Sequence, residues 1–206
     1  MQKLIRGIID FHETKSKEVR ELFAKLALGQ KPDCFFIACS DSRVAANVFA
    51  STDPGDLFVI RNVGNIVPPY PYTGSAVAAL EFAVNNLKVG HIVVCGHSDC
   101  GAMHALSQSR DSLNETPLGI WLRHAQKATT DFKDVDGLSQ KNVALQLDNL
   151  RSHPLVKEKE NAGEIRLHGL WFNIRDVEVY YLESPPDKFV LIDSRKGDEI
   201  LSGLEE

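Results

Sequence analysis

The chain of 206 residues is long enough for one domain with a hydrophobic core, and its 43% hydrophobic content excludes an intrinsically disordered protein. The formal net charge of -5 argues against a nucleic-acid-binding protein, although a small anionic substrate is compatible with it. No apolar run reaches the ~20 residues of a membrane-spanning helix, and the charged start lacks a signal-peptide pattern. These features predict a cytoplasmic protein without a membrane or nucleic-acid partner.

The first predicted element is a helix over 3–28, where apolar residues recur at helical spacing. Continuously apolar runs then predict three buried strands, at 34–39, 57–60 and 91–95. A helix over 74–87 separates the second strand from the third. A strand, a helix and a further strand form a βαβ unit, so these strands are expected to be parallel.

The second half of the chain predicts further helices and strands. A helix follows Gly101, and two more helices are expected over 117–130 and 138–157. Late strands are expected at 164–172, 176–182 and 188–192. Alternation at Val177, Val179 and Tyr181 predicts a half-exposed strand at the edge of the sheet. The fold class is therefore α/β, with a mostly parallel central sheet, an antiparallel edge and helices on both faces. Without a repeat or a linker, we expect one domain over 1–206, comprising a helical arm (1–30) and an α/β core (31–206).

Two of the early strands end in metal-binding residue types. Cys39 ends the first, while His97 and Cys100 follow the third. The carboxyl ends of parallel strands meet at one edge of the sheet, where ligands bind. Two thiolates and one imidazole are typical zinc ligands, and three ligands with an open fourth position indicate a catalytic site. Asp41 is placed to fill or guard that position, and the guanidinium of Arg43 is placed to clamp the Asp41 carboxylate.

The chain has four cysteines, too few for a disulfide framework at this length. Cys34 and Cys95 lie inside or at the end of predicted strands, and we interpret them as small buried side chains rather than ligands.

Four co-linear motifs resemble the β-class carbonic anhydrases, in their bacterial and plant-like branch. They are ACSDSR (38–43), PGDLFVIRNV (54–63), VPPY (67–70) and VCGHSDCG (94–101). The resemblance extends over about 28–174, and it includes Asn142, Gln146, Asn149 and Leu167–Gly169. It implies reversible hydration of CO2 to bicarbonate and a proton, by attack of a zinc-bound hydroxide, with one zinc ion per chain.

The resemblance also implies a role for each motif residue. Cys39, His97 and Cys100 hold the zinc ion. Asp41 is a conditional fourth ligand: it either blocks the metal or is held away from it by Arg43 while water takes its place. An ionised Asp41 can only accept a hydrogen bond, so it would orient the attacking hydroxide.

The substrate pocket follows from the resemblance alone. It implies Phe58, Val63 and Phe82 as apolar walls, with the Gln30 amide and the Gly101 backbone N–H as donors. The family's N-terminal helix reaches across to a neighbouring chain, and the apolar side chains near the start of this chain suit that role. We therefore expect a homodimer, or a tetramer formed by pairing dimers, in which Gln30, Phe58 and Phe82 face the partner's zinc.

Alternative functions stay open at this point. A relative on the same scaffold could hydrolyse another linear gas, such as carbonyl sulfide or carbon disulfide. A non-catalytic zinc and thiolate protein that senses oxidation is the alternative from another class. His104 is interpreted as an ordinary surface or core histidine in preference to a proton shuttle.

Overall fold

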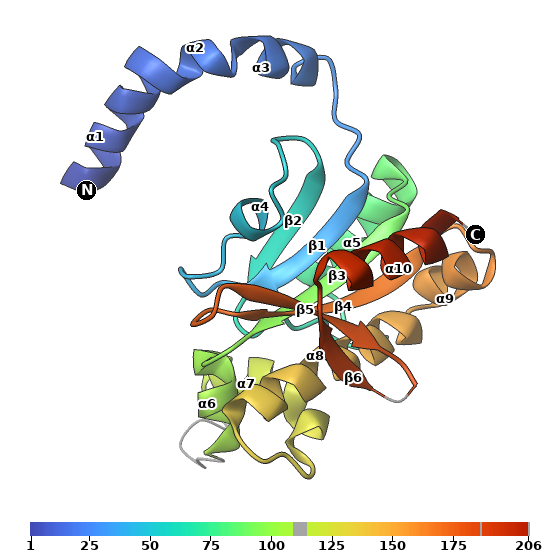
Figure 1. Cartoon of the computed structure of the whole chain (residues 1–206). Coiled ribbons are helices and arrows are strands. Elements are labelled where there is room, and N and C mark those ends of the chain that lie inside the picture. The colour runs from blue at the N-terminus through green and yellow to red at the C-terminus, as the bar shows by residue number, and fades with distance from the viewer. Residues whose placement is uncertain (109–114, 186, 206) are drawn as a thin grey trace. The chain divides into compact units, whose positions relative to one another are not determined.

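The computed structural model describes residues 1–108, 115–185 and 187–205, and it divides into the compact units Met1–Lys31 and Pro32–Glu206. The first unit is helical: α1 (Gln2–Asp10), a π-helical turn (Phe11–Lys15), α2 (Ser16–Glu18) and α3 (Arg20–Leu26) (Figure 1). The single helix predicted over 3–28 is therefore interrupted, since Val19 leaves helical geometry with φ -96° and ψ 0°. None of the side chains described in these helices is buried, and α1 exposes Leu4, Ile5, Ile8 and Ile9.

The second unit is built on a six-stranded sheet in the order β2-β1-β3-β4-β5-β6 (Figure 1). The strands are β1 (Cys34–Cys39), β2 (Leu57–Asn62), β3 (His91–His97), β4 (Arg166–Asn173), β5 (Glu178–Glu183) and β6 (Lys188–Leu191). The first four pair in parallel, and β5 and β6 add antiparallel pairs. The predicted α/β fold, with a mostly parallel sheet and an antiparallel edge, is confirmed.

The helices of the second unit cover both faces of the sheet. They are α4 (Ala46–Phe49), α5 (Ser75–Phe82) with a π-helical end (Ala83–Leu87), α6 (Gly101–Ser107), α7 (Pro117–Leu122) with a 3-10 end (Arg123–Thr129), α8 (Val135–Ser152), α9 (Pro154–Asn161) and α10 (Ser194–Glu205). Of the helices that the structure describes, none combines the length and apolar character needed to span a bilayer.

Several details differ from the sequence prediction. The helix expected over 138–157 is two helices, because Pro154 has no backbone N–H and begins a new helix after the extended residue His153. The strand expected from 176 begins at Glu178, since Val177 lies in a turn with φ +57°. That strand, β5, pairs on both sides, so the edge strands of the sheet are β6 and, at the opposite end, β2. The helices α4 and α10 were not predicted.

The core fills both sides of the central strands. On one face, Phe35, Ile37, Ile92 and Val94 belong to a buried cluster with residues of α5, α8 and α9. On the other face, alternate residues of the same strands pack with α4. Over β4 and β5, α10 is held by a hydrogen bond from Arg166 Nη1 to the Gly203 carbonyl (2.7 Å). The inner strands β1 and β3 are therefore covered on both faces, which explains their continuous apolar runs. The prediction of a buried strand at 57–60 is wrong as to burial, because β2 lies at the edge of the sheet and none of its residues is buried.

The helix α8 packs against β3 and β4 at glycine positions. A Cβ atom at Gly96 would lie 2.7 Å from Val143 Cγ2, and one at Gly169 would lie 3.0 Å from Val143 Cγ1. These separations are shorter than a van der Waals contact, so the close approach of the helix requires glycine in both strands.

We predict that Gly96→Ala lowers the free energy of unfolding by ~1–3 kcal/mol, the usual cost of overpacking a core. Adding Val143→Ala should restore part of the loss, because the crowding methyl group is then absent. Urea unfolding of the metal-free variants measures both values. Gly90→Ala is the matched control, since a Cβ there meets nothing within 4 Å. Strictly additive losses for Gly96→Ala and Val143→Ala would contradict this packing argument.

Candidate metal centre

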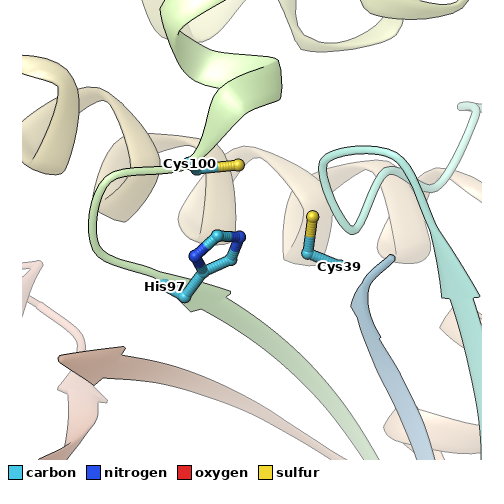
Figure 2. Close-up of side chains that lie close together, drawn as sticks. All are labelled: Cys39, His97 and Cys100. Carbon is cyan, nitrogen blue, oxygen red and sulfur yellow. The ribbon is translucent and has the colours of Figure 1, made fainter. Parts of the chain in front are cut away.

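The pairing of β1 with β3 brings the first metal-ligating residue types together. The two strands are parallel, with Ala38 opposite Cys95, so Cys39 and His97 both lie at the carboxyl edge of the sheet. The chain turns after His97, and Cys100 caps the N-terminus of α6. Figure 2 shows the two thiol groups and the imidazole directed toward one another from these three positions.

The three side chains form a compact and buried donor group. Their ligand atoms all lie within 4.8 Å of one another, and Cys39, His97 and Cys100 are 5%, 0% and 1% exposed. His97 Nδ1 is 2.9 Å from the Ser98 carbonyl, which assigns the ring proton to Nδ1. The buried Nε2 has no hydrogen-bond partner among the residues that the structure describes. An unpaired buried nitrogen is costly, and a metal ion would satisfy it. Two thiols and one imidazole suit zinc, so these residues fit that ion.

The two thiols strongly affect each other's protonation. The hydrogen bond between the two thiols lowers the pKa of Cys39 and raises the pKa of Cys100, which burial and the negative charge on Cys39 raise further. Without a metal, the pair therefore tends to hold one proton between two sulfur atoms. A divalent cation replaces that proton, which couples metal binding to proton release.

The carboxylate of Asp41 is bound by Arg43. Its oxygens accept hydrogen bonds from Arg43 Nε (3.0 Å) and Arg43 Nη2 (2.8 Å), and Oδ1 also accepts from the Arg43 backbone N–H (3.0 Å). These hydrogen bonds hold the pKa of Asp41 well below its ordinary value. The carboxylate is therefore ionised at neutral pH and can only accept hydrogen bonds. In this arrangement the negative charge of Asp41 is paired with the guanidinium of Arg43.

Three hydrogen bonds hold the segment that carries Cys39 and Asp41. Arg61, on the neighbouring strand β2, donates from Nε to the Cys39 carbonyl (3.0 Å) and from Nη2 to the Asp41 carbonyl (2.6 Å). The backbone N–H of Gly64 donates to Cys39 Sγ (3.4 Å). A thiolate that accepts a hydrogen bond is stabilised, so β2 contributes to the metal-ligand group without a ligand of its own.

A buried polar stripe on α8 fixes the loops behind the cluster. Its members are Ser139, Asn142, Gln146 and Asn149, which lie on one helical face. Ser139 Oγ donates to the His97 carbonyl (2.8 Å), and Asn142 Nδ2 donates to the Gly64 carbonyl (3.0 Å). The Val67 N–H donates to Gln146 Oε1 (2.9 Å). The stripe therefore satisfies backbone groups of both loops that surround the thiols.

The predicted pocket residues fall into separate groups. Phe58 and Phe82 pack with ring centroids 5.7 Å apart, but Phe58 lies four residues before the strand end that faces Cys39, about 13 Å along a strand. Val63 is close to the cluster through its neighbour Gly64, and its carbonyl accepts from Trp121 Nε1 (2.7 Å). The roles of these residues stay predictions.

Two further pocket predictions concern backbone and amide donors. Gly101 is the first residue of α6, next to Cys100. Gln30 belongs to the N-terminal unit, which is described separately from the core. These roles are also untested.

The remaining cysteines lie outside the donor group. Cys95 is fully buried and Cys34 is half-buried, and burial raises the pKa of each thiol to about 12. Both are therefore protonated at neutral pH. The structure places neither in the metal-ligating cluster, among the residues it describes.

One charged residue near the site has no counterpart in the sequence prediction. Asp99 lies between His97 and Cys100, and its carboxylate contacts both Arg43 and His104. The sequence contains no local signal for this arrangement, because Arg43 is 56 residues away along the chain.

Comparisons with known proteins agree with this geometry. The family model described as carbonic anhydrase matches residues 34–179. A carbonic anhydrase of Pseudomonas aeruginosa is 41% identical over 201 residues, covering 92% of this chain and 91% of the relative. A carbonic anhydrase of Synechocystis is 37% identical, covering 95% of this chain and 76% of that relative.

Solved structures agree as well. The β-carbonic anhydrase CcaA is similar with a TM-score of 0.88 and 36% identity, covering 97% of this chain and 96% of that one. A tetrameric β-carbonic anhydrase from Sordaria macrospora is similar with a TM-score of 0.75 and 31% identity, covering 88% of this chain and 95% of that one. With its Cys-His-Cys metal site, the chain belongs to the β-class carbonic anhydrases, close to the bacterial and cyanobacterial enzymes, and is itself a carbonic anhydrase.

Proposed function

We propose that the chain catalyses the reversible hydration of CO2 to bicarbonate and a proton, using one zinc ion per chain held by Cys39, His97 and Cys100. The observation that carries this proposal is the meeting of three buried ligand atoms within 4.8 Å, one of them an unpaired imidazole nitrogen. Three protein ligands leave a fourth position open, which is typical of catalytic zinc sites. When bound, zinc supplies Lewis acidity that lowers the pKa of water toward ~7.

Asp41 and Arg43 are proposed to control that fourth position. While Arg43 binds the carboxylate, Asp41 is ionised and can accept the hydrogen of the attacking group, which directs the oxygen lone pairs at CO2. When Asp41 leaves Arg43, the same carboxylate can become the fourth ligand and block the site. Its side chain is 18% exposed, so it lies between the buried cluster and solvent.

The substrate is proposed to occupy an apolar pocket completed by a second chain. Phe58, Val63 and Phe82 would form its walls, and the Gln30 amide and the Gly101 N–H would donate hydrogen bonds. The distance of Phe58 from the metal-ligating edge of its own strand supports a role toward the partner's site. A small linear molecule without charge requires mostly apolar walls with few donors.

The assembly is proposed to be a homodimer, with a tetramer of paired dimers as the larger form. The exposed Leu4, Ile5, Ile8 and Ile9 on α1 support an apolar contact with another chain. The relative from Sordaria macrospora is described as tetrameric.

Replacing Cys100 by Ala should abolish zinc binding and CO2 hydration together, because one of three ligands is lost. Elemental analysis should show zinc falling from about one ion per chain toward zero, and stopped-flow hydration measures the activity. Cys34→Ala is the matched control, since this thiol lies outside the cluster, and it should keep both. A fully zinc-loaded Cys100→Ala variant would contradict the assignment.

Replacing Arg43 by Ala should leave zinc bound but lower kcat roughly 10- to 100-fold, because Asp41 loses the group that holds it away from the metal. Elemental analysis and stopped-flow hydration measure the two effects. Arg195→Ala removes an exposed arginine of α10 and serves as the control. Near-normal turnover of Arg43→Ala would rule out control of the metal by this pair.

Charging the apolar face of α1 should dissociate the assembly. The double substitution Leu4→Glu and Ile8→Glu places carboxylates where an apolar contact is proposed, and activity should fall as monomers form. Analytical ultracentrifugation with parallel hydration assays measures both. Lys3→Glu, on the same helix, is the control for added charge. A monomeric wild-type protein with full activity would refute the proposed assembly.

A further inference from the structure

The guanidinium of Arg43 is bound on two sides by different aspartates. Its Nε and Nη2 donate to Asp41, while Nη1 donates to Asp99 Oδ2 (3.0 Å) and Nη2 also donates to the Asp99 carbonyl (3.0 Å). Asp99 therefore uses the side of the guanidinium that Asp41 leaves free. The two carboxylates do not compete for one donor, because Nη2 is shared only between the Asp41 carboxylate and the Asp99 backbone carbonyl.

Asp99 is itself held in one orientation. Its second oxygen, Oδ1, lies 2.9 Å from His104 Nε2, and its backbone N–H donates to Asp136 Oδ1 (2.7 Å). The residue has φ +53°, a left-handed conformation that Asp and Asn tolerate better than most residues. With both carboxylate oxygens and both backbone polar groups engaged, Asp99 is a fixed anchor for Arg43.

We propose that Asp99, oriented by His104, is a positioning residue that keeps Arg43 facing Asp41 and so keeps the Asp41 carboxylate away from the metal. This inference rests on the proposed function, in which Asp41 is the conditional fourth ligand. In this inference His104 has a structural role: it forms a hydrogen bond with one oxygen of the Asp99 carboxylate, and Arg43 binds the other oxygen.

The physical need for an anchor follows from the exposure of Arg43. Its side chain is 44% exposed, and a long side chain loses rotamer freedom when it is held in one geometry. The pair with Asp41 engages only Nε and Nη2, so by itself it leaves Nη1 of the exposed guanidinium without a carboxylate. Two carboxylates and a carbonyl on one planar guanidinium restrict the orientation of the side chain much more strongly. Without Asp99, Arg43 samples other orientations, and Asp41 is released for part of the time.

The direct test is Asp99→Asn, which keeps the size of the side chain and tolerates the left-handed backbone. We expect kcat to fall about threefold to tenfold with little change in KM, a smaller effect than for Arg43→Ala. His104→Ala should act in the same direction and more weakly. Glu164→Gln, which removes a carboxylate paired with Lys159 just before β4, should leave activity unchanged.

A spectroscopic readout separates positioning from a general structural effect. With cobalt in place of zinc, the visible absorption spectrum depends on whether the fourth ligand is a carboxylate or water. The Asp99→Asn spectrum should shift toward that of Arg43→Ala. In a chain that carries Asp41→Asn, no side-chain carboxylate at position 41 can reach the metal as a ligand, so adding Asp99→Asn should leave the spectrum unchanged.

The outcomes distinguish this inference from the proposed function. An Asp99→Asn variant with wild-type kcat and an unshifted cobalt spectrum would overturn the positioning role while leaving the zinc enzyme intact. An increase in kcat would show instead that Asp99 competes with Asp41 for Arg43. A spectral change that persists when Asp41 is replaced would assign Asp99 to the fold of the turn. A wild-type protein that binds no metal would refute the proposed function itself.

Discussion

The parallel pairing of β1 with β3 is the constraint on which the site depends. It places Cys39 and His97 at one edge of the sheet, although 57 residues separate them along the sequence. The pairing requires both strands to be buried on both faces, and α8 approaches closely enough to meet that need only because Gly96 carries no side chain. The same helix uses its polar stripe to satisfy the loops around the thiols. The tight core packing and the metal centre are therefore produced by the same helix and strands.

The first three strands could be predicted because each contains a continuous apolar run. The apolar run 34–39 predicted a buried strand, and the structure confirms its bounds. The prediction that 176–182 forms an edge strand was wrong for a physical reason. Alternation indicates a half-buried strand, and an antiparallel strand inside the sheet, such as β5, can be half-buried too. The helix α10 begins among charged residues, and its position over the sheet depends on Arg166 and other distant residues that periodicity cannot identify.

The metal-ligating residues could be predicted because cysteine and histidine are uncommon and because parallel strands bring their carboxyl ends to one edge of the sheet. Two thiols and an imidazole at strand ends indicate a metal whichever loops connect them. Asp99 was missed because its function depends on a contact across 56 residues with Arg43. An aspartate between two ligands carries no pattern of its own. Such a contact depends on the relative rotation of two loops, which spacing along one chain does not define.

Charge balance explains why the position of Arg43 matters so much in the proposed function. With the metal bound, the thiolates of Cys39 and Cys100, which are both buried, would together neutralise a divalent cation. A third anionic ligand would leave that site with a net negative charge, at a cost that grows with burial. Asp41 therefore has two unequal alternatives: an excess charge at the metal, or an ion pair with Arg43 near solvent. Because the second alternative exists only while Arg43 stays in place, the groups that anchor this guanidinium at the surface determine access to a metal centre buried beneath it.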